Sequence, residues 1–160
     1  MKTQRGLTLV ELIMFIVIVS VGVAGILLVL NVTVAGSADP MVRKQALAVA
    51  EALMDEVLSK EFANPAGGAS PTTPGNPAQA ERPLFDDVSD YHGAAWTGVA
   101  SLTNPAVPIT GLESYAVTIS VTGTTELAGI DASHAKKIVI LVDTGQGEAI
   151  TLTGYRTNYE

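Results

Sequence analysis

The residues best suited to metal chemistry in this sequence are three closely spaced aspartates, Asp86, Asp87 and Asp90, followed by His92. Carboxylate oxygens are the ligands that hard divalent cations prefer. The spacing matches no EF-hand loop, because the glycine at the turn position and the terminal bidentate glutamate are missing. Aspartates in loops more commonly accept hydrogen bonds from nearby backbone N–H groups. We therefore expect no metal and no other cofactor, and keep the three aspartates as weak metal candidates.

Residues for other kinds of catalysis are scarce. His134 lies in the polar segment DASHAKK, and no serine has histidine and aspartate partners in a recognisable nucleophile motif. Gly145-Gln146-Gly147 is typical of a hairpin turn, not of a phosphate-binding loop. The chain has no cysteine, which excludes disulfides, thiol nucleophiles and cysteine zinc sites. We expect a protein that is not an enzyme.

One carboxylate stands in an unusual place. Glu11 directly precedes Leu12–Leu30, a run of 19 residues without a charge. A helix of that length spans about 28 Å, close to the thickness of a bilayer core. Ionisable residues beside or within such a segment are costly and are usually functional. The remaining chain has the composition of a soluble protein, with no second apolar run of that length.

The charge distribution predicts the orientation of this span. The net charge is −7, and Lys2 and Arg5 give residues 1–6 a charge of +2, which leaves −9 for residues 7–160. Positive charge before the span predicts a cytoplasmic N-terminus, with the rest outside. An acidic exterior also disfavours binding to nucleic acid through bulk charge.

The helix-forming pattern continues after a weak stretch. Asn31–Pro40 is rich in poor helix formers, so a helix is expected to loosen or kink there. Met41–Phe62 has apolar residues at helical spacing and predicts an amphipathic helix, with Asp39 as a cap and Pro40 as its first residue. Most of its apolar stripe is expected to be core.

The last part of the chain predicts a sheet. Asn64–Pro83 contains five prolines and three glycines and predicts a long, exposed and mobile connection. Tyr115–Val121, Lys137–Val142 and Ala149–Tyr155 have strand patterns separated by turn residues, which predicts an antiparallel meander. The expected fold is α+β, with a long N-terminal helix whose outer, amphipathic half packs on a small antiparallel sheet.

An ordinary signal peptide is an alternative interpretation of the N-terminus. It would have a basic start, a shorter apolar stretch and small residues at its cleavage site. Val34–Ala38 offers small residues, but the apolar run exceeds the usual length and Glu11 would have no role.

The sequence Arg5-Gly6-Leu7-Thr8-Leu9-Val10-Glu11-Leu12 closely resembles the class III signal of type IV pilins and type II secretion pseudopilins. The resemblance implies that a prepilin peptidase in the inner membrane cuts between Gly6 and Leu7 and methylates the new amine of Leu7. It also implies a pilin-like fold and assembly, through an inner-membrane platform, into a filament with a core of N-terminal helices. Thr8 and Glu11 would serve assembly and register.

Glu11 then has a physical role. Cleavage gives Leu7 a cationic amine, and Glu11 follows it by one helical turn, so the two charges can pair within hydrocarbon. The resemblance further implies that Glu11 meets the amine of a neighbouring subunit. Two departures from the common pattern are Leu7, where most relatives have phenylalanine, and the absence of a proline between Leu12 and Leu30.

Patches up to about residue 93, including Ser37–Pro40 and Phe85–Gly93 (FDDVSDYHG), resemble minor pilins of the mannose-sensitive haemagglutinin (MSHA) pilus. This implies a minor pilin that contacts other minor and major pilins, for adhesion or motility, with a periplasmic head. The alternatives are a type II secretion minor pseudopilin and a pilus-tip adhesin. The expected organisation is a leader (1–6), a membrane and assembly helix (7–30), an outer helix (31–63), a loop (64–83) and a β-rich head (84–160).

Overall fold

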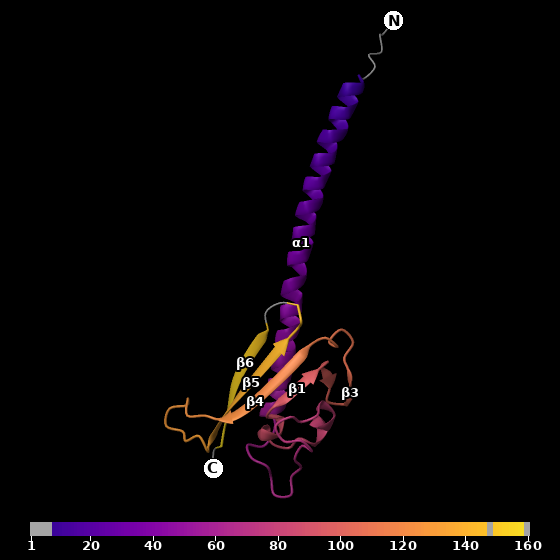
Figure 1. Ribbon diagram of the computed structural model, residues 1–160. Coiled ribbons are helices and arrows are strands. Elements are labelled where there is room, and N and C mark those ends of the chain that lie inside the picture. Colours follow the sequence, from indigo (N-terminus) through magenta and orange to yellow (C-terminus); the bar gives the residue numbers. More distant parts are fainter. Residues whose placement is uncertain (1–7, 147–148, 159–160) are drawn as a thin grey trace. The chain divides into compact units, whose positions relative to one another are not determined.

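The computed structural model describes residues 8–146 and 149–158, without the side chains of residues 31–39. The chain divides into two units, Met1–Met41 and Val42–Glu160. The helix α1 (Leu9–Leu58) contributes to both units (Figure 1). The second unit, called the head below, also holds the 3-10 helices η1 (Gln79–Leu84) and η2 (Val88–Tyr91) and the strands β1–β6.

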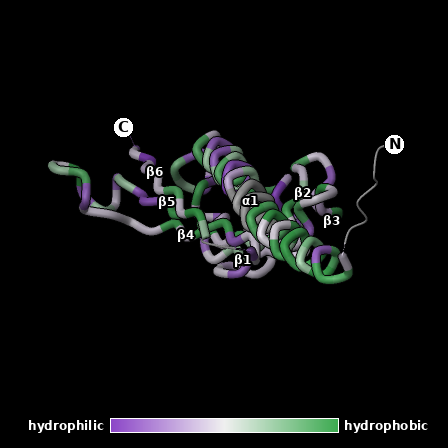
Figure 2. Tube along the Cα trace, turned by 90° about the horizontal axis from the view of Figure 1, so that it is seen from above, coloured by the Kyte–Doolittle hydropathy of each residue, from purple (hydrophilic) through white to green (hydrophobic). Residues whose placement is uncertain are grey.

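The first unit contributes an apolar helical segment, Leu9–Leu30, which is 22 residues long and can cross a membrane by its length and composition. We call this segment the span. Figure 2 shows the hydrophobic residues of α1 in green. All side chains of the span are exposed in the isolated chain. The hydroxyl of Ser20 donates to the carbonyl oxygen of Ile16 at 2.6 Å, so this polar group has a partner inside the helix. The N-terminal apolar helix expected from the sequence is confirmed.

The limits of α1 differ from those predicted. Pro40 lies inside the helix, so the predicted start at Asp39–Pro40 is wrong. Proline removes one backbone donor, but helix propensity is a weak indicator that the surrounding structure overrides. At the other end α1 stops at Leu58, before the predicted Phe62. The N–H of Lys60 bonds to the Val57 carbonyl at 3.1 Å, which tightens the last turn.

The main sheet of the head has the strand order β1-β4-β5-β6, and all neighbours are antiparallel. A separate hairpin joins the short strands β2 and β3. The α+β class and the antiparallel meander expected from the sequence are confirmed. Only β1 in this sheet was not anticipated, because its four residues are too few to show a pattern. The strands are β1 (Ala94–Thr97), β2 (Ala100–Ser101), β3 (Asn104–Pro108), β4 (Ala116–Gly123), β5 (Ala135–Asp143) and β6 (Ile150–Thr157).

The core of the head lies between the sheet and the part of α1 that belongs to the head. Alternate residues of β4 and β5 face α1, because side chains along a strand point to opposite faces. Gly154 in β6 lies close to α1, since a Cβ atom there would lie 2.6 Å from the Met54 sulfur. The buried residues that α1, β4 and β5 contribute are Ala46, Val49, Ala50, Leu53, Met54, Val57, Val117, Ile119, Val121, Ile138, Ile140 and Val142.

Most residues of the proline-rich loop, residues 64–83, are exposed, as the sequence predicts, but parts of the loop contact the head. Pro77 is fully buried, and its carbonyl oxygen accepts a hydrogen bond from the Trp96 indole at 2.8 Å. Gly93 has a φ of +78°, and a Cβ atom on it would lie 2.0 Å from the Gly75 carbonyl oxygen. Gly93, which lies outside the loop, therefore contacts the loop backbone where a larger residue would not fit.

Candidate functional site

The N-terminus of α1 is held by Thr8. The Thr8 hydroxyl accepts a hydrogen bond from the N–H of Glu11 at 3.3 Å, and the Thr8 carbonyl accepts from the N–H of Leu12 at 3.1 Å. Thr8 is therefore the N-cap of a helix whose first residue is Leu9. A threonine followed three residues later by a glutamate is the sequence pattern of a capping box. The sequence reasoning connected Thr8 with assembly and missed this local role.

Glu11 lies in the first turn of α1 and is exposed. A carboxylate near a helix N-terminus is favoured by the helix dipole, so part of its presence there has a local explanation. The dipole does not neutralise the charge, and the residues that follow in the span are apolar. A carboxylate in hydrocarbon needs a cationic partner. No ion pair of Glu11 is found among residues 8–146 and 149–158.

The predicted cleavage residues Gly6 and Leu7 lie outside the described residues. The described helix begins at Leu9, which follows the Gly6–Leu7 bond in sequence. Thr8 and Glu11, the other two residues of the predicted signal, are the ones that the structure places. The predicted roles of all four stay predictions.

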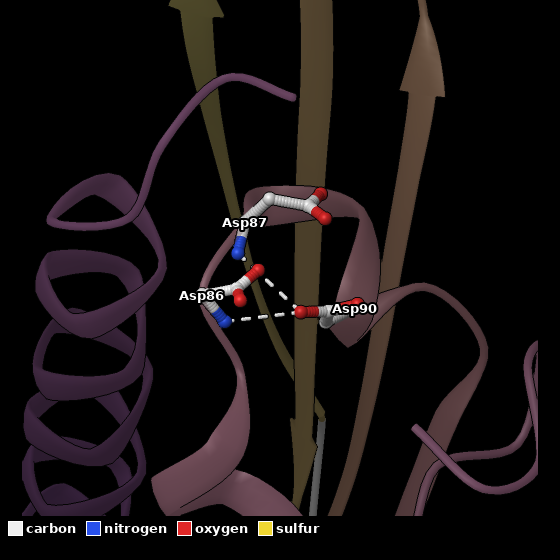
Figure 3. A group of neighbouring side chains, drawn as sticks. All are labelled: Asp86, Asp87 and Asp90. Carbon is white, nitrogen blue, oxygen red and sulfur yellow. Dashed lines mark hydrogen bonds between the residues drawn. The ribbon is translucent and has the colours of Figure 1, made fainter. Parts of the chain in front are cut away.

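The three aspartates predicted as weak metal candidates do lie together (Figure 3). One oxygen of each carboxylate lies within 4.8 Å of the others. Asp90 Oδ2 accepts hydrogen bonds from the N–H groups of Asp86 and Asp87 at 3.0 and 3.3 Å. Asp87 Oδ1 accepts from the N–H of Ser89 at 2.6 Å, which caps η2. The Asp87 and Asp90 carboxylates thus organise the turn in which they lie, whereas Asp86 Oδ2 accepts from the N–H of Ala69 in the proline-rich loop at 2.6 Å.

The surroundings of the aspartates include buried backbone, the ammonium group of Lys136 and, nearby in sequence, His92. Burial raises the pKa of Asp90, while the two backbone N–H groups that it accepts from lower it. The Lys136 ammonium donates to the Ser89 hydroxyl at 2.7 Å, and burial lowers its pKa while the charges of Asp87 and Asp90 raise it. A cation of the chain itself therefore lies near the carboxylates and would oppose a second one. His92 is not part of the cluster, and its Nδ1 accepts from the N–H of Val121 at 3.2 Å.

A buried polar network that sequence reasoning missed connects α1 with η1 and η2. Arg82 is only 3% exposed and donates to both carboxylate oxygens of Glu56, and also to the Ala100 carbonyl at 2.7 Å. The Tyr91 hydroxyl donates to Glu56 Oε1 at 2.8 Å. Burial and the charge of Glu56 raise the pKa of Tyr91. Arg82 also lies over the ring of Trp96, at 5.4 Å from its centroid.

Arg82 and Tyr91 both donate to Glu56, so the buried polar groups of this network satisfy one another. A groove of about 570 Å³ lies alongside, and apolar residues such as Leu53, Leu102 and Ile109 provide most of its lining. Glu56 and Arg82, which also line the groove, already neutralise each other. Local sequence offered no indication of the pair, because Glu56 lies on a predicted helix and Arg82 in a predicted loop.

Comparison with known proteins gives one positive result. Residues 1–27 match the family model of the prokaryotic N-terminal methylation motif. No curated protein and no solved structure matches the chain. The motif supports a protein of the type IV pilin or pseudopilin type, which implies processing by a prepilin peptidase and use of the pilin assembly machinery in general. The apolar helix Leu9–Leu30 fits the membrane anchor of such a protein.

Proposed function

We propose that this protein is a structural subunit of a type IV pilus or related filament, cut between Gly6 and Leu7, methylated on Leu7, and assembled through its N-terminal helix. The observation that carries the proposal is the methylation motif at residues 1–27, which overlaps the exposed apolar helix Leu9–Leu30. An apolar helix without its own core needs lipid or other apolar helices around it. A pilin subunit would have lipid around this helix before assembly and the helices of neighbouring subunits around it in the filament.

The N-terminal geometry supports the cleavage step. Thr8 caps α1, and the first helical residue is Leu9, so the bond between Gly6 and Leu7 precedes the described helix. A peptidase needs an extended substrate, and a helix that began earlier in the chain would have to unwind. Thr8 is thus a positioning residue for processing, and Lys2 and Arg5 would hold the leader in the cytoplasm.

Glu11 is proposed to set the register of the subunit in the filament. After cleavage, the Leu7 amine and the Glu11 carboxylate are separated by one turn, and a neighbouring subunit offers the same pair. An unmatched arrangement leaves a charge in an apolar environment, which is strongly disfavoured. Subunits are therefore expected to dock only where a carboxylate meets an amine.

Assembly of Glu11 variants tests this proposal. Glu11→Ala is expected to be cut and to stay in the membrane, but to be reduced at least about tenfold in sheared filaments, because docking leaves an unpaired amine. Glu11→Asp keeps the charge and should retain part of the incorporation. Glu51→Ala is the matched control, because Glu51 is an exposed glutamate on the same helix within the head. Normal incorporation of Glu11→Ala would contradict the register role.

More narrowly, we infer a minor pilin of an MSHA-like pilus that joins other minor pilins to prime or cap the fibre and serves adhesion or motility. Only the sequence resemblance in patches up to about residue 93 supports this narrower assignment. These patches are Ser37–Pro40, Gln45–Leu47, Met54–Leu58, Phe62 and Phe85–Gly93. A deletion strain that loses MSHA-like fibres, with secretion intact, would favour it. Loss of secretion with normal fibres would favour the pseudopilin alternative, and normal fibres that fail to adhere would favour a tip adhesin.

A further inference from the structure

The strand β6 forms one edge of the main sheet. It pairs with β5 over its full length, from Ile150 to Thr157, without a register shift. In the described part of the chain no strand pairs with its other side, as Figure 1 shows. Its eight residues make β6 twice as long as β1, the strand at the opposite edge. A long regular edge strand is a template for pairing with another chain.

The backbone groups that β6 presents outward can be identified. The N–H of Asn158 donates to the carbonyl of His134 at 3.0 Å, in the same register as the β5–β6 ladder. In an antiparallel pair, residues with hydrogen bonds to the partner alternate with residues whose groups point away. The even-numbered residues of β6 therefore bond to β5. Thr151, Thr153 and Tyr155 point their N–H and carbonyl groups away from the sheet.

The usual devices that protect an edge are few on β6. The strand contains no proline and no bulge, and Arg156 is its only charged residue. On the face of the sheet that points away from the core, the side chains of Thr151 and Thr153 are exposed. On the other face, Ile150 and Leu152 are only partly buried against the core. An added strand with apolar residues at alternate positions would cover these two side chains.

Two arginines lie near this edge. The Nε atom of Arg156, at one end of β6, is buried and has no hydrogen-bond partner among the described residues. Arg43 lines a hollow with Leu47 and Ile150 at the other end, and is exposed. Neither takes part in the ion pairs found among the described residues. On a chain with a net charge of −7, a positive charge near each end of an edge that is unpaired in the described part of the chain favours an acidic partner.

We propose that the outer edge of β6 binds an extended segment of another protein chain that alternates apolar and polar residues and carries a carboxylate near each end. The segment would add as a further strand, through the outward groups of Thr151, Thr153 and Tyr155, with its carboxylates on Arg43 and Arg156. This is β-strand addition, in which the backbone supplies affinity and alternate side chains supply specificity.

A second copy of the chain fits this edge less well. Antiparallel pairing of two β6 strands would bring together two chains that each carry a net charge of −7, which is unfavourable. The two arginines would also face an edge that offers no carboxylate among the described residues of β6.

The test uses the detergent-solubilised full chain and a fluorescein-labelled peptide of sequence EVTVTVTE, with KVTVTVTK as the peptide control. Thr153→Pro removes one outward N–H but leaves the bonds from β6 to β5 in place, and edge strands tolerate proline. Thr153→Val is the matched control, because it changes the side chain and keeps the N–H. Arg156→Gln removes the charge without touching the backbone. Fluorescence of Trp96, the only tryptophan, verifies that each variant is folded.

We expect saturable binding of the acidic peptide, lost with Thr153→Pro, retained with Thr153→Val and weakened about fivefold by Arg156→Gln. Equal binding of the acidic and basic peptides, or no saturable binding, would overturn the proposal. Stronger binding by Arg156→Gln would identify Arg156 as a guard against pairing and would also overturn it. A chain that dimerises in size-exclusion chromatography, and becomes monomeric with Thr153→Pro, would assign the edge to a second copy instead. None of these outcomes depends on processing at Gly6.

Discussion

Ile16 in the span leaves 54% of its surface exposed, whereas Ile140 at the centre of β5 leaves none. Both are isoleucines in regular secondary structure with satisfied backbones. The head supplies apolar neighbours from its own chain, because α1, β4 and β5 converge on one core. The span supplies none, so its neighbours must come from lipid or from other helices. Substitutions in the head are therefore expected to change folding, and substitutions in the span to change location and assembly.

The largest expected contrast is between Ile140→Ala and Ile16→Ala. Truncating the fully buried Ile140 should lower the free energy of unfolding of the head by about 3–4 kcal/mol, through lost burial and a cavity. Ile16→Ala should leave the head unchanged. Thermal unfolding of the detergent-solubilised chain, monitored by Trp96 fluorescence, measures both. Equal effects of the two substitutions would remove the distinction between the regions.

A smaller loss is expected when the buried polar network is broken. Arg82→Leu leaves the Glu56 carboxylate without its cation in a site where the two side chains are 4% and 13% exposed. We expect the free energy of unfolding to fall by about 3 kcal/mol, because removing Arg82 leaves the Glu56 carboxylate buried without a cationic partner. Tyr91→Phe removes a single hydrogen bond and should cost about 1 kcal/mol. The same unfolding assay applies, and an Arg82→Leu head as stable as the parent would contradict the role of this network.

Gly154→Ala should have a weaker effect. Its Cβ atom would lie 2.6 Å from the flexible Met54 side chain, so some repacking is possible and a cost of about 1 kcal/mol is expected. Gly25→Ala in the span is the control, because nothing lies within 4 Å of a Cβ atom there. In a double-mutant cycle, Met54→Ala should reduce the cost of Gly154→Ala. Strictly additive effects would show that the helix and β6 do not meet at this point.

The smallest effect concerns pH. Burial raises the pKa of Asp90, so the folded head holds this proton more tightly than the unfolded chain does. The resulting stabilisation is present below the unfolded pKa of about 4 and is lost as pH rises through the folded pKa. Asp90→Asn should therefore show a flatter dependence of unfolding temperature on pH in the acidic range above the unfolded pKa. An unchanged pH profile would mean that Asp90 does not contribute to it.

Local patterns predicted the span, the meander and the methylation motif, because each depends on neighbours in sequence. The contacts of Arg82 with Glu56 and of Pro77 with Trp96 join residues far apart in the chain, and no local pattern indicates them. For the same reason the composition of residues 64–83 predicted an exposed connection but not its contacts with the head, although proline and glycine also allow close packing. The capping role of Thr8 could have been predicted from the threonine and glutamate three residues apart. The same two residues belong to the resemblance to the pilin signal, which assigned them to assembly.

The central claim is that the chain matures by cleavage between Gly6 and Leu7. Intact mass and N-terminal sequencing of the membrane-extracted protein, from cells with and without the prepilin peptidase gene, test it most directly. We predict a chain that begins at N-methylated Leu7 in the parent strain and an uncut chain in the strain without the peptidase. A chain that begins near Ala38 in both strains would instead show ordinary signal-peptide cleavage and would contradict the claim, and an uncut chain in both would leave a simple membrane anchor.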